Sequence, residues 1–205
     1  MIKIQVEQGS EAWHSLRLGR FTASKFKSLM SGETTEGYKD VILDVVGEIL
    51  SGEAEDSYSS PDMIRGTELE PEARAYFEHS KEVEVEQVGF CLPDDEELAE
   101  WVGVSPDGIL PDGGLLEIKC PKLKTHLKYL EAGRLPNEYK WQVQGQLLVT
   151  GAPYCVFISY YPDFPAFELR VEPDAEMHQQ LMARFRVAID VAKEKLEFYR
   201  NLKNE

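Results

Sequence analysis

The chain has 205 residues, of which 42% are hydrophobic and 29% are charged. This length and composition exclude a disordered or low-complexity protein and are typical of one globular domain, which we expect to span residues 1–205. No stretch approaches the roughly 18 apolar residues of a membrane helix, and the N-terminus lacks the basic start and apolar core of a secretory signal. We therefore expect a cytoplasmic protein without a membrane partner. Its three cysteines are odd in number and widely spaced, which favours reduced thiols over disulfides.

Charge is negative overall but unevenly distributed along the chain. Asp and Glu number 37 against 22 Lys and Arg, and the formal net charge of −15 argues against a passive coat of phosphate contacts. However, residues 12–27 and 119–140 are basic, whereas residues 91–114 contain no Lys or Arg. The pattern fits a protein that binds phosphate in one cleft and repels it elsewhere. It equally fits ordinary charge scatter over a solvated surface.

Helices are predicted to predominate in the N-terminal part of the chain. Residues 9–32 predict two short helices, the first capped by Ser10 and the second by Thr22 or Ser24. Residues 41–50 predict a buried helix, and residues 51–62 predict an acidic, mobile surface loop. An amphipathic helix is predicted from Thr67 onward.

A block of strands with turn-forming separators follows. The predicted strands cover residues 83–92, 99–110, 114–120, 154–161 and 166–171, and further helices are predicted over residues 137–149 and 174–202. Because helices stand before, inside and after the strands, we expect an α/β (α+β) sandwich. Its centre is predicted to be a mixed sheet of about five strands, flanked by helices.

The stretch from Asp107 to Lys119 carries the most informative chemistry. Alternate side chains of a strand share a face, so Glu117 and Lys119 are predicted to point one way while Ile118 points into the core. A hairpin would bring the carboxylate of Asp107 beside that of Glu117. Two like charges that close repel each other unless a cation lies between them. Hard oxygen ligands with open positions suit Mg²⁺, and the residues therefore predict a magnesium site.

The alternative interpretation is an ordinary Asp-Gly turn followed by a solvated strand face. It is disfavoured because LLEIKCP places Glu117 and Lys119 in an otherwise apolar strand. Burying charges there costs several kcal/mol unless they are paired or bind a metal. A bound metal makes its water a better nucleophile and stabilises charge on a phosphate. Lys119 beside it would position or deprotonate that water, or steady the developing charge.

The order of several motifs resembles that of the PD-(D/E)xK nucleases. Within that group the chain is similar to the lambda exonuclease or YqaJ-type viral recombinase family. The resemblance rests on an Asp followed at a distance by Glu–x–Lys, and on segments in the same order through most of the chain, namely GSEAWHSLRLGRFTAS, RGTELEPEAR, SPDG, LLEIKCP and YKWQVQGQLLVTG. It implies a restriction-endonuclease-like core and a metal-dependent nuclease.

The resemblance also implies roles for individual residues. Asp107 and Glu117 would bind Mg²⁺ (or Mn²⁺) directly, together with the backbone carbonyl of Ile118. Lys119 would be the catalytic lysine. Glu70 matches the upstream acidic residue of the family, which reaches a metal directly or through water.

Glu70 has a second interpretation, and a helix glutamine completes the implied catalytic set. If Thr67 begins a helix, Glu70 is simply the N3 residue of a capping box. Gln142 matches the family's glutamine beside the lysine and the nucleophilic water, with Tyr139 as a supporting residue. Tyr139, Gln142 and Gln146 share one helix face by their spacing, which would otherwise be a polar outer face.

Two residues of the first basic segment match the family's pocket for a 5′-terminal phosphate. Arg17 would bind that phosphate through its guanidinium, and Ser24 would add a hydroxyl and helix-start amides. The alternative for Arg17 is a plain surface charge. Trp13 is interpreted as an anchor in the core rather than as a platform for stacking bases.

The leading hypothesis is a Mg²⁺-dependent 5′→3′ exonuclease. It would degrade one strand of linear double-stranded DNA to mononucleotides and leave a 3′ overhang for annealing-type recombination. The family resemblance implies a homotrimeric ring around DNA and a single-strand annealing protein as partner. An endonuclease of the same core would have no use for an end-phosphate pocket, an inactive DNA-binding module conflicts with the intact catalytic set, and an acidic DNA mimic conflicts with the basic segments.

Overall fold

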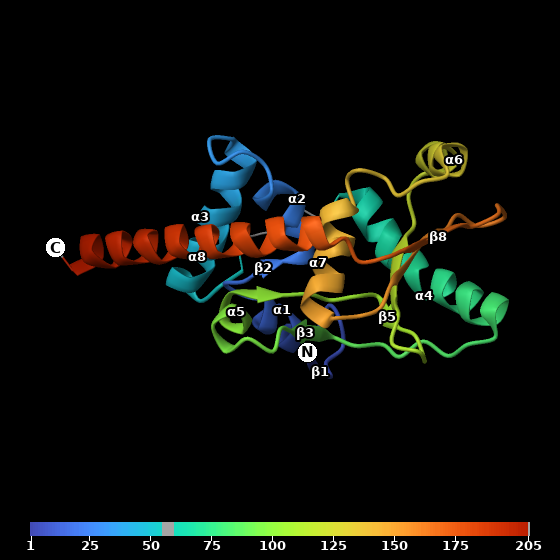
Figure 1. Cartoon of the computed structure of the whole chain (residues 1–205), viewed down its shortest axis with the longest axis horizontal. Coiled ribbons are helices and arrows are strands. Elements are labelled where there is room, and N and C mark those ends of the chain that lie inside the picture. Colours follow the sequence, from blue (N-terminus) through green and yellow to red (C-terminus); the bar gives the residue numbers. More distant parts are fainter. Residues whose placement is uncertain (55–59, 205) are drawn as a thin grey trace.

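The computed structural model describes residues 1–54 and 60–204. A four-stranded sheet in the order β5-β6-β7-β8 is accompanied by two strand pairs, β1-β3 and β2-β4 (Figure 1). The strands are β1 (Ile2–Ile4), β2 (Phe21–Thr22), β3 (Phe90–Leu92), β4 (Val102–Gly103), β5 (Gly108–Ile109), β6 (Leu115–Lys119), β7 (Cys155–Ser159) and β8 (Phe167–Val171). The helices are α1 (Glu11–Arg17), α2 (Phe26–Leu29), α3 (Glu36–Ser51), α4 (Pro61–Lys81), α5 (Glu96–Trp101), α6 (Leu123–Ala132), α7 (Lys140–Thr150) and α8 (Ala175–Asn204), with a 3-10 turn η1 (Ala23–Lys25) before α2.

The four-stranded sheet is mixed, as predicted. β6 pairs antiparallel with β5 and parallel with β7, and β7 pairs antiparallel with β8. The parallel pair requires a crossover, which α6 and α7 provide. β6 is therefore an interior strand, and its apolar side chains are buried on both of its faces.

The two faces of this sheet pack against different helices. On one face, Leu115 and Phe157 lie in a core cluster with residues of α7 and α8. On the other face, Leu116 and Ile118 pack in a second cluster with Ala73 and other residues of α4. Figure 1 shows the strands between α7 and α4, with α8 running beside α3 and extending past the body to the C-terminus. The polar residues of β6 are thus held between two helical layers.

Several helix boundaries follow the predicted signals. Ser10 caps α1 by accepting a hydrogen bond from Trp13 N, as predicted. Thr22 precedes η1 but makes no capping hydrogen bond with its side chain, so the second predicted cap is wrong in detail. α3 contains the predicted buried helix and ends at Gly52, whose positive φ of 74° suits a glycine.

α4 begins earlier than predicted. Its first residue is Pro61, capped by Ser60, so Thr67 lies inside the helix and its hydroxyl donates to Met63 O. The predicted loop over residues 51–62 is correspondingly shorter, and its central residues 55–59 lie outside the described part of the chain. Because Thr67 does not begin a helix, the capping-box interpretation of Glu70 is wrong.

The strand block differs from the prediction, and the main sheet has four strands rather than about five. Only the end of the predicted strand 83–92 is a strand, although Glu86 forms an isolated bridge with Ile109. The predicted strand 99–110 begins as helix α5, which Asp95 caps, and then divides into the short strands β4 and β5 of different sheets. Helix α6 was not predicted, whereas α7, α8 and the pair β7-β8 lie close to their predicted ranges.

Close packing of α2 on α7 joins the N-terminal helices to the sheet. A Cβ atom at Gly145 would lie 2.2 Å from the ring of Phe26, so this approach requires glycine. The segment with η1 and α2 therefore lies against the same helix that covers β6.

The three cysteines are buried and free, as predicted. No helix in the described part of the chain combines the length and apolar character needed to span a membrane.

Candidate active site

β6 places its charged pair on the face covered by α7. The side chain of Glu117 is fully buried, and that of Lys119 is 24% exposed and pairs with Glu117 Oε1. Ile118 points to the opposite face and packs in the α4 cluster. This alternation agrees with the prediction from the sequence. We call Asp107, Glu117 and Lys119 the strand site.

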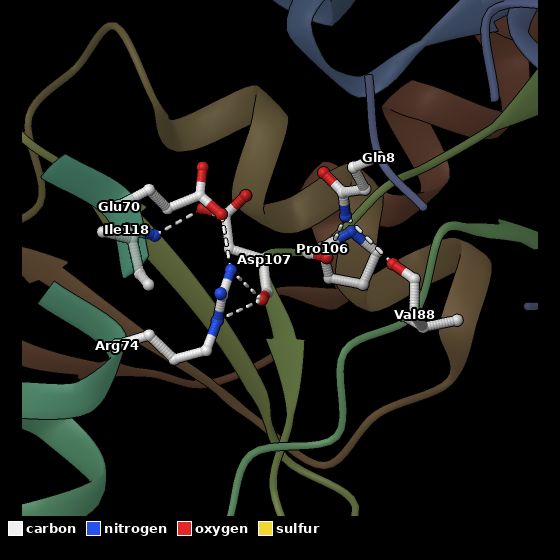
Figure 2. Close-up of polar contacts among 7 residues, drawn as sticks. All are labelled: Gln8, Glu70, Arg74, Val88, Pro106, Asp107 and Ile118. Carbon is white, nitrogen blue, oxygen red and sulfur yellow. Dashed lines mark hydrogen bonds and ion pairs between the residues drawn. The ribbon is translucent and has the colours of Figure 1, made fainter. Parts of the chain in front are cut away.

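Asp107 directly precedes β5 and lies beside β6. Gly108 pairs with Leu116, and extending this register by two residues places Pro106 opposite Ile118. Proline has no N–H to donate, so the ladder cannot continue there. Instead, the Asp107 carboxylate accepts a hydrogen bond from Ile118 N at 2.6 Å (Figure 2). The predicted hairpin thus brings Asp107 to the middle of β6.

The backbone of β6 also presents a carbonyl on this side. Tyr160 N donates to Lys119 O at 2.8 Å, so the Lys119 carbonyl faces β7. Successive residues of a strand direct their peptide groups to opposite sides. The Ile118 carbonyl therefore faces away from β7, towards the side on which Ile118 N contacts Asp107. This is the placement that a backbone metal ligand at Ile118 requires.

Arg74 ties Glu70 to the Asp107 segment. Its guanidinium pairs with Glu70 Oε1 and donates to Asp107 O from Nε and Nη2, at 3.3 and 3.2 Å. From the other side, Gln8 donates to Pro106 O at 3.0 Å and to Val88 O at 2.9 Å. Figure 2 shows Asp107 between these two anchors. The structure therefore brings Glu70 close to Asp107, and Arg74 and Gln8 are positioning contacts that the sequence analysis missed.

The polar face of α7 points at Glu117, not at solvent. Gln142 donates to Glu117 Oε1, and Gln146 donates to Glu117 Oε2 at 2.7 Å. The Tyr139 ring lies just before α7, with its centroid 5.3 Å from Lys119 Nζ. The alternative of a polar outer face is therefore wrong. Gln146 was not assigned to the site from the sequence, although its spacing of four from Gln142 was the available signal.

The electrostatics of the strand site favour an additional cation. Burial raises the pKa of Asp107 well above its usual value, and the carboxylates of Glu117 and Glu70 raise it further against the opposing effect of Lys119. Although burial opposes the charge of Lys119, the carboxylates of Glu117 and Asp107 raise its pKa above the usual value. Lys119 is therefore an ammonium at neutral pH. With Arg74, two cations face three carboxylates, which leaves an excess negative charge.

The donor set fits a hard divalent cation. Asp107, Glu117 and the Ile118 carbonyl offer oxygen atoms only, the ligands that Mg²⁺ prefers, and Mg²⁺ typically uses few protein ligands and retains water. As the described side chains lie, no three His, Cys, Asp or Glu residues converge into a metal cluster. Glu117 instead pairs with Lys119 and Glu70 with Arg74. Metal binding would therefore compete with these internal ion pairs.

The predicted phosphate-binding residues lie together on the N-terminal segment. Arg17 Nη2 donates to Thr22 Oγ1 at 3.3 Å, and Thr22 Oγ1 lies 3.5 Å from Ser24 Oγ. We call Arg17, Thr22 and Ser24 the Arg17 cluster; Thr22 was missed as a member. Burial lowers the pKa of Arg17 to about 10, although Glu48 opposes this effect. Arg17 is therefore not a plain surface charge, and it remains protonated at neutral pH.

Trp13 supports this cluster. The guanidinium of Arg17 lies 4.1 Å from the centroid of its ring. Its indole N–H contacts Gly89 O and Ser105 Oγ, both at 3.0 Å. Trp13 is half-buried, so it is anchored by hydrogen bonds more than by the core. It connects the Arg17 cluster to the segment that precedes Asp107.

The mixed sheet brings two carboxylates and a lysine together at β6 and directly before β5. The chain belongs to the YqaJ-like viral recombinase domain family, whose sequence profile matches residues 12–153. Its structure is similar to an alkaline exonuclease, LHK-Exo, from Laribacter hongkongensis, with a TM-score of 0.87, 30% identity, and coverage of 95% of this chain and 98% of that chain. LHK-Exo has also been solved in complex with dAMP, and matches equally well in that structure.

A phage-related exonuclease from Haemophilus somnus has the same fold at greater distance. Its TM-score is 0.67 and its identity 13%, over 91% of this chain and 99% of that chain. Among curated proteins, no sequence matches this chain significantly. The chain is thus homologous to alkaline exonucleases, and its exonuclease-like fold agrees with the nuclease class that the sequence predicts.

Proposed function

We propose that this chain is a Mg²⁺-dependent 5′→3′ exonuclease that degrades one strand of linear double-stranded DNA. It releases mononucleotides and leaves a 3′ single-stranded overhang for annealing-type recombination. The observation that carries the proposal is the meeting of Asp107, Glu117 and Lys119 in a chain homologous to an alkaline exonuclease. The dAMP complex of LHK-Exo supports mononucleotide recognition in this fold.

The strand site holds the metal and the reacting phosphate. Asp107, Glu117 and the Ile118 carbonyl would bind Mg²⁺ (or Mn²⁺), and Glu70 would be a further ligand, directly or through water. When bound, the metal would supply an activated water and stabilise charge on the phosphate. Lys119, protonated beside Glu117, orients the attacking water and steadies the charge that develops on the phosphate. Gln142, supported by Tyr139, holds one oxygen of Glu117 in register with Lys119.

The Arg17 cluster recognises the 5′-terminal phosphate and sets the polarity of degradation. A guanidinium binds two phosphate oxygens at once, and the hydroxyls of Thr22 and Ser24 add further donors. Among the described residues no carboxylate pairs directly with Arg17, so its charge is available to an anion. The carboxylate of Glu48 raises the pKa of Arg17 by its charge, but its own contacts are with Gly19 N and Lys25.

We further propose a homotrimeric ring around DNA and a single-strand annealing protein as partner. Enclosure would hold DNA without a strong phosphate grip, which suits a net charge of −15. The extended end of α8 supports an intersubunit role, because Phe198 and Leu202 are 58% and 53% exposed (Figure 1). Exposed apolar side chains of this size on one helix are typical of surfaces buried by association.

The test is digestion of linear double-stranded DNA labelled at either end, with and without a 5′ phosphate, in Mg²⁺ or EDTA. The wild type is expected to remove nucleotides from the phosphorylated 5′ end only in Mg²⁺. Lys119→Ala is expected to lose about 10²–10⁴-fold in rate, the usual contribution of a group that moves protons or stabilises charge in the transition state. Cleavage of closed circular DNA would instead support an endonuclease, and no cleavage with any metal would support a DNA-binding module.

A further inference from the structure

A second glutamine of α7 contacts Glu117 and has no part in the roles proposed above. Gln146 donates from Nε2 to Glu117 Oε2 at 2.7 Å, whereas Gln142 donates to Oε1, the oxygen that also pairs with Lys119. Both carboxylate oxygens are therefore held by amides one helical turn apart. Gln142 is half-buried, whereas Gln146 is fully buried and contacts the other oxygen of Glu117.

The other end of the Gln146 amide is unsatisfied. Its Oε1 atom is buried and has no hydrogen-bond partner among the described residues. Turning the amide over would place this oxygen against the Glu117 carboxylate, which is itself an acceptor. The orientation of Gln146 is therefore set by Glu117. A buried acceptor without a partner lowers stability, so this orientation of the amide is held by the charge-assisted hydrogen bond from Nε2 to Glu117. The side-chain amide of Gln146 has no other hydrogen bond among the described residues.

We propose that Gln146 is a positioning residue that fixes the Glu117 carboxylate and thereby sets the affinity of the strand site for Mg²⁺. The proposal rests on the proposed function in taking Glu117 as a metal ligand. A hydrogen bond from behind a ligand restricts its rotation and keeps its free lone pairs directed at the metal. Removing such a hydrogen bond typically weakens metal binding or activity by about 10–100-fold.

Gln144 provides a matched control on the same helix. It is 4% exposed, and both ends of its amide are bonded away from Glu117. Its Nε2 donates to Glu172 O and its Oε1 accepts from Asp174 N, both at 2.9 Å. Gln144→Met removes two hydrogen bonds to backbone groups, so it is expected to lower the melting temperature as Gln146→Met does. It is expected to leave Mg²⁺ binding unchanged.

The experiment is calorimetric titration of Mg²⁺ into the full chain without DNA, for the wild type, Gln146→Met, Gln146→Asn and Gln144→Met. Both Gln146 variants are expected to raise the Kd for Mg²⁺ by about 10–100-fold. Their nuclease rates are expected to recover as Mg²⁺ is raised to saturation, because the hydrogen bond to Glu117 affects occupancy of the metal site. A purely structural role would lower the melting temperature without this dependence on metal concentration.

The two Gln146 variants guard against a failure to fold. Methionine keeps the length and shape but removes the amide, whereas asparagine keeps the amide and is one methylene too short to reach Glu117. A folded variant of either kind that binds Mg²⁺ as tightly as the wild type would overturn the role of Gln146 and leave the proposed nuclease intact. A wild type that binds no Mg²⁺ would overturn the metal-dependent function, and the role of Gln146 with it.

Discussion

The strand site and the Arg17 cluster are both partly enclosed, but their charges are unbalanced in opposite directions. At the strand site, the carboxylates of Asp107, Glu117 and the neighbouring Glu70 outnumber the cations Lys119 and Arg74. In the Arg17 cluster, a half-buried guanidinium is surrounded by hydroxyls and an aromatic ring. The first region therefore needs a cation, and the second needs an anion.

In the proposed exonuclease, one substrate would complete both regions. A DNA end would bring a terminal phosphate to the Arg17 cluster, and the divalent cation would accompany the phosphodiester at the strand site. The two regions are built differently as well, because Glu117 is buried in a strand while Ser24 is exposed on a short helical turn. Since α2 packs on α7 at Gly145, the same helix connects them. Chemistry and end recognition should therefore be separable by mutation.

Arg17→Ala should give the largest effect on end recognition. It removes a charged hydrogen-bond donor worth about 1.5–3 kcal/mol, so degradation from 5′-phosphorylated ends should fall by about 10–150-fold. Degradation from 5′-hydroxyl ends should change little, because those ends have no charge for Arg17 to bind. The measurement is the ratio of kcat/KM for the two kinds of end. Lys27→Ala, an exposed lysine in the same basic segment, is the control and should leave that ratio unchanged.

Asp107→Asn tests the excess negative charge of the strand site by its effect on the free energy of unfolding. A carboxyl whose pKa is raised in the folded state binds protons more tightly there than in the unfolded chain, so folding weakens as pH rises. In EDTA, the free energy of unfolding of the wild type should fall as pH rises from about 4 through the raised pKa of Asp107. Asp107→Asn should lack this decline. Mg²⁺ should restore stability to the wild type at neutral pH, but not to the variant.

Asp112 provides the control, because its pKa is lowered in the folded chain whereas that of Asp107 is raised. Its carboxylate accepts hydrogen bonds from the Tyr154 hydroxyl and Gly114 N, and the bond from Tyr154 is the main reason that its pKa is lowered. Its contribution to stability is present above the unfolded pKa and is lost as pH falls through the folded one. Asp112→Asn should therefore leave the decline at rising pH intact. A decline that persists in Asp107→Asn would contradict the assignment of the charge excess to the strand site.

The strand site was predictable because its signals are local. Glu117, Ile118 and Lys119 alternate within one strand, and turn residues fix the return of the chain from Asp107. The facing helix was also predictable, since Gln142 and Gln146 are separated by one helical turn. The long closing helix and the last strand pair follow from periodicity over many residues.

The features missed from the sequence depend on tertiary contacts. Residues 83–89 have a strand-like pattern, but Glu86 pairs with Ile109 only as an isolated bridge. Thr67 and Glu70 satisfy the capping-box pattern, yet Pro61 and Ser60 provide the real start of α4. The contact of Arg74 with the Asp107 carbonyl joins residues 33 positions apart, and no local pattern indicates it.

Helix α6 was also not predicted from the sequence, and substitutions of its exposed lysines are expected to have the smallest effect on activity. It follows β6 directly, and its lysines belong to the basic segment 119–140. Lys122 pairs with Asp62, whereas Lys124 and Lys128 are exposed and have no acidic partner within the described residues. If these two lysines contact phosphates of bound DNA, Lys124→Gln and Lys128→Gln should each raise KM about 2- to 5-fold without changing kcat.

Salt dependence distinguishes a phosphate contact from a general change of charge. A variant that no longer neutralises one DNA phosphate should have a slope of log binding affinity against log salt concentration that is shallower by about 0.9. Lys203→Gln makes the same charge change at the far end of α8 and should alter neither KM nor the slope, because this end lies well away from α6 (Figure 1). An equal shift in all three variants would mean that only net charge matters. The DNA path would then be set by the strand site and the Arg17 cluster alone.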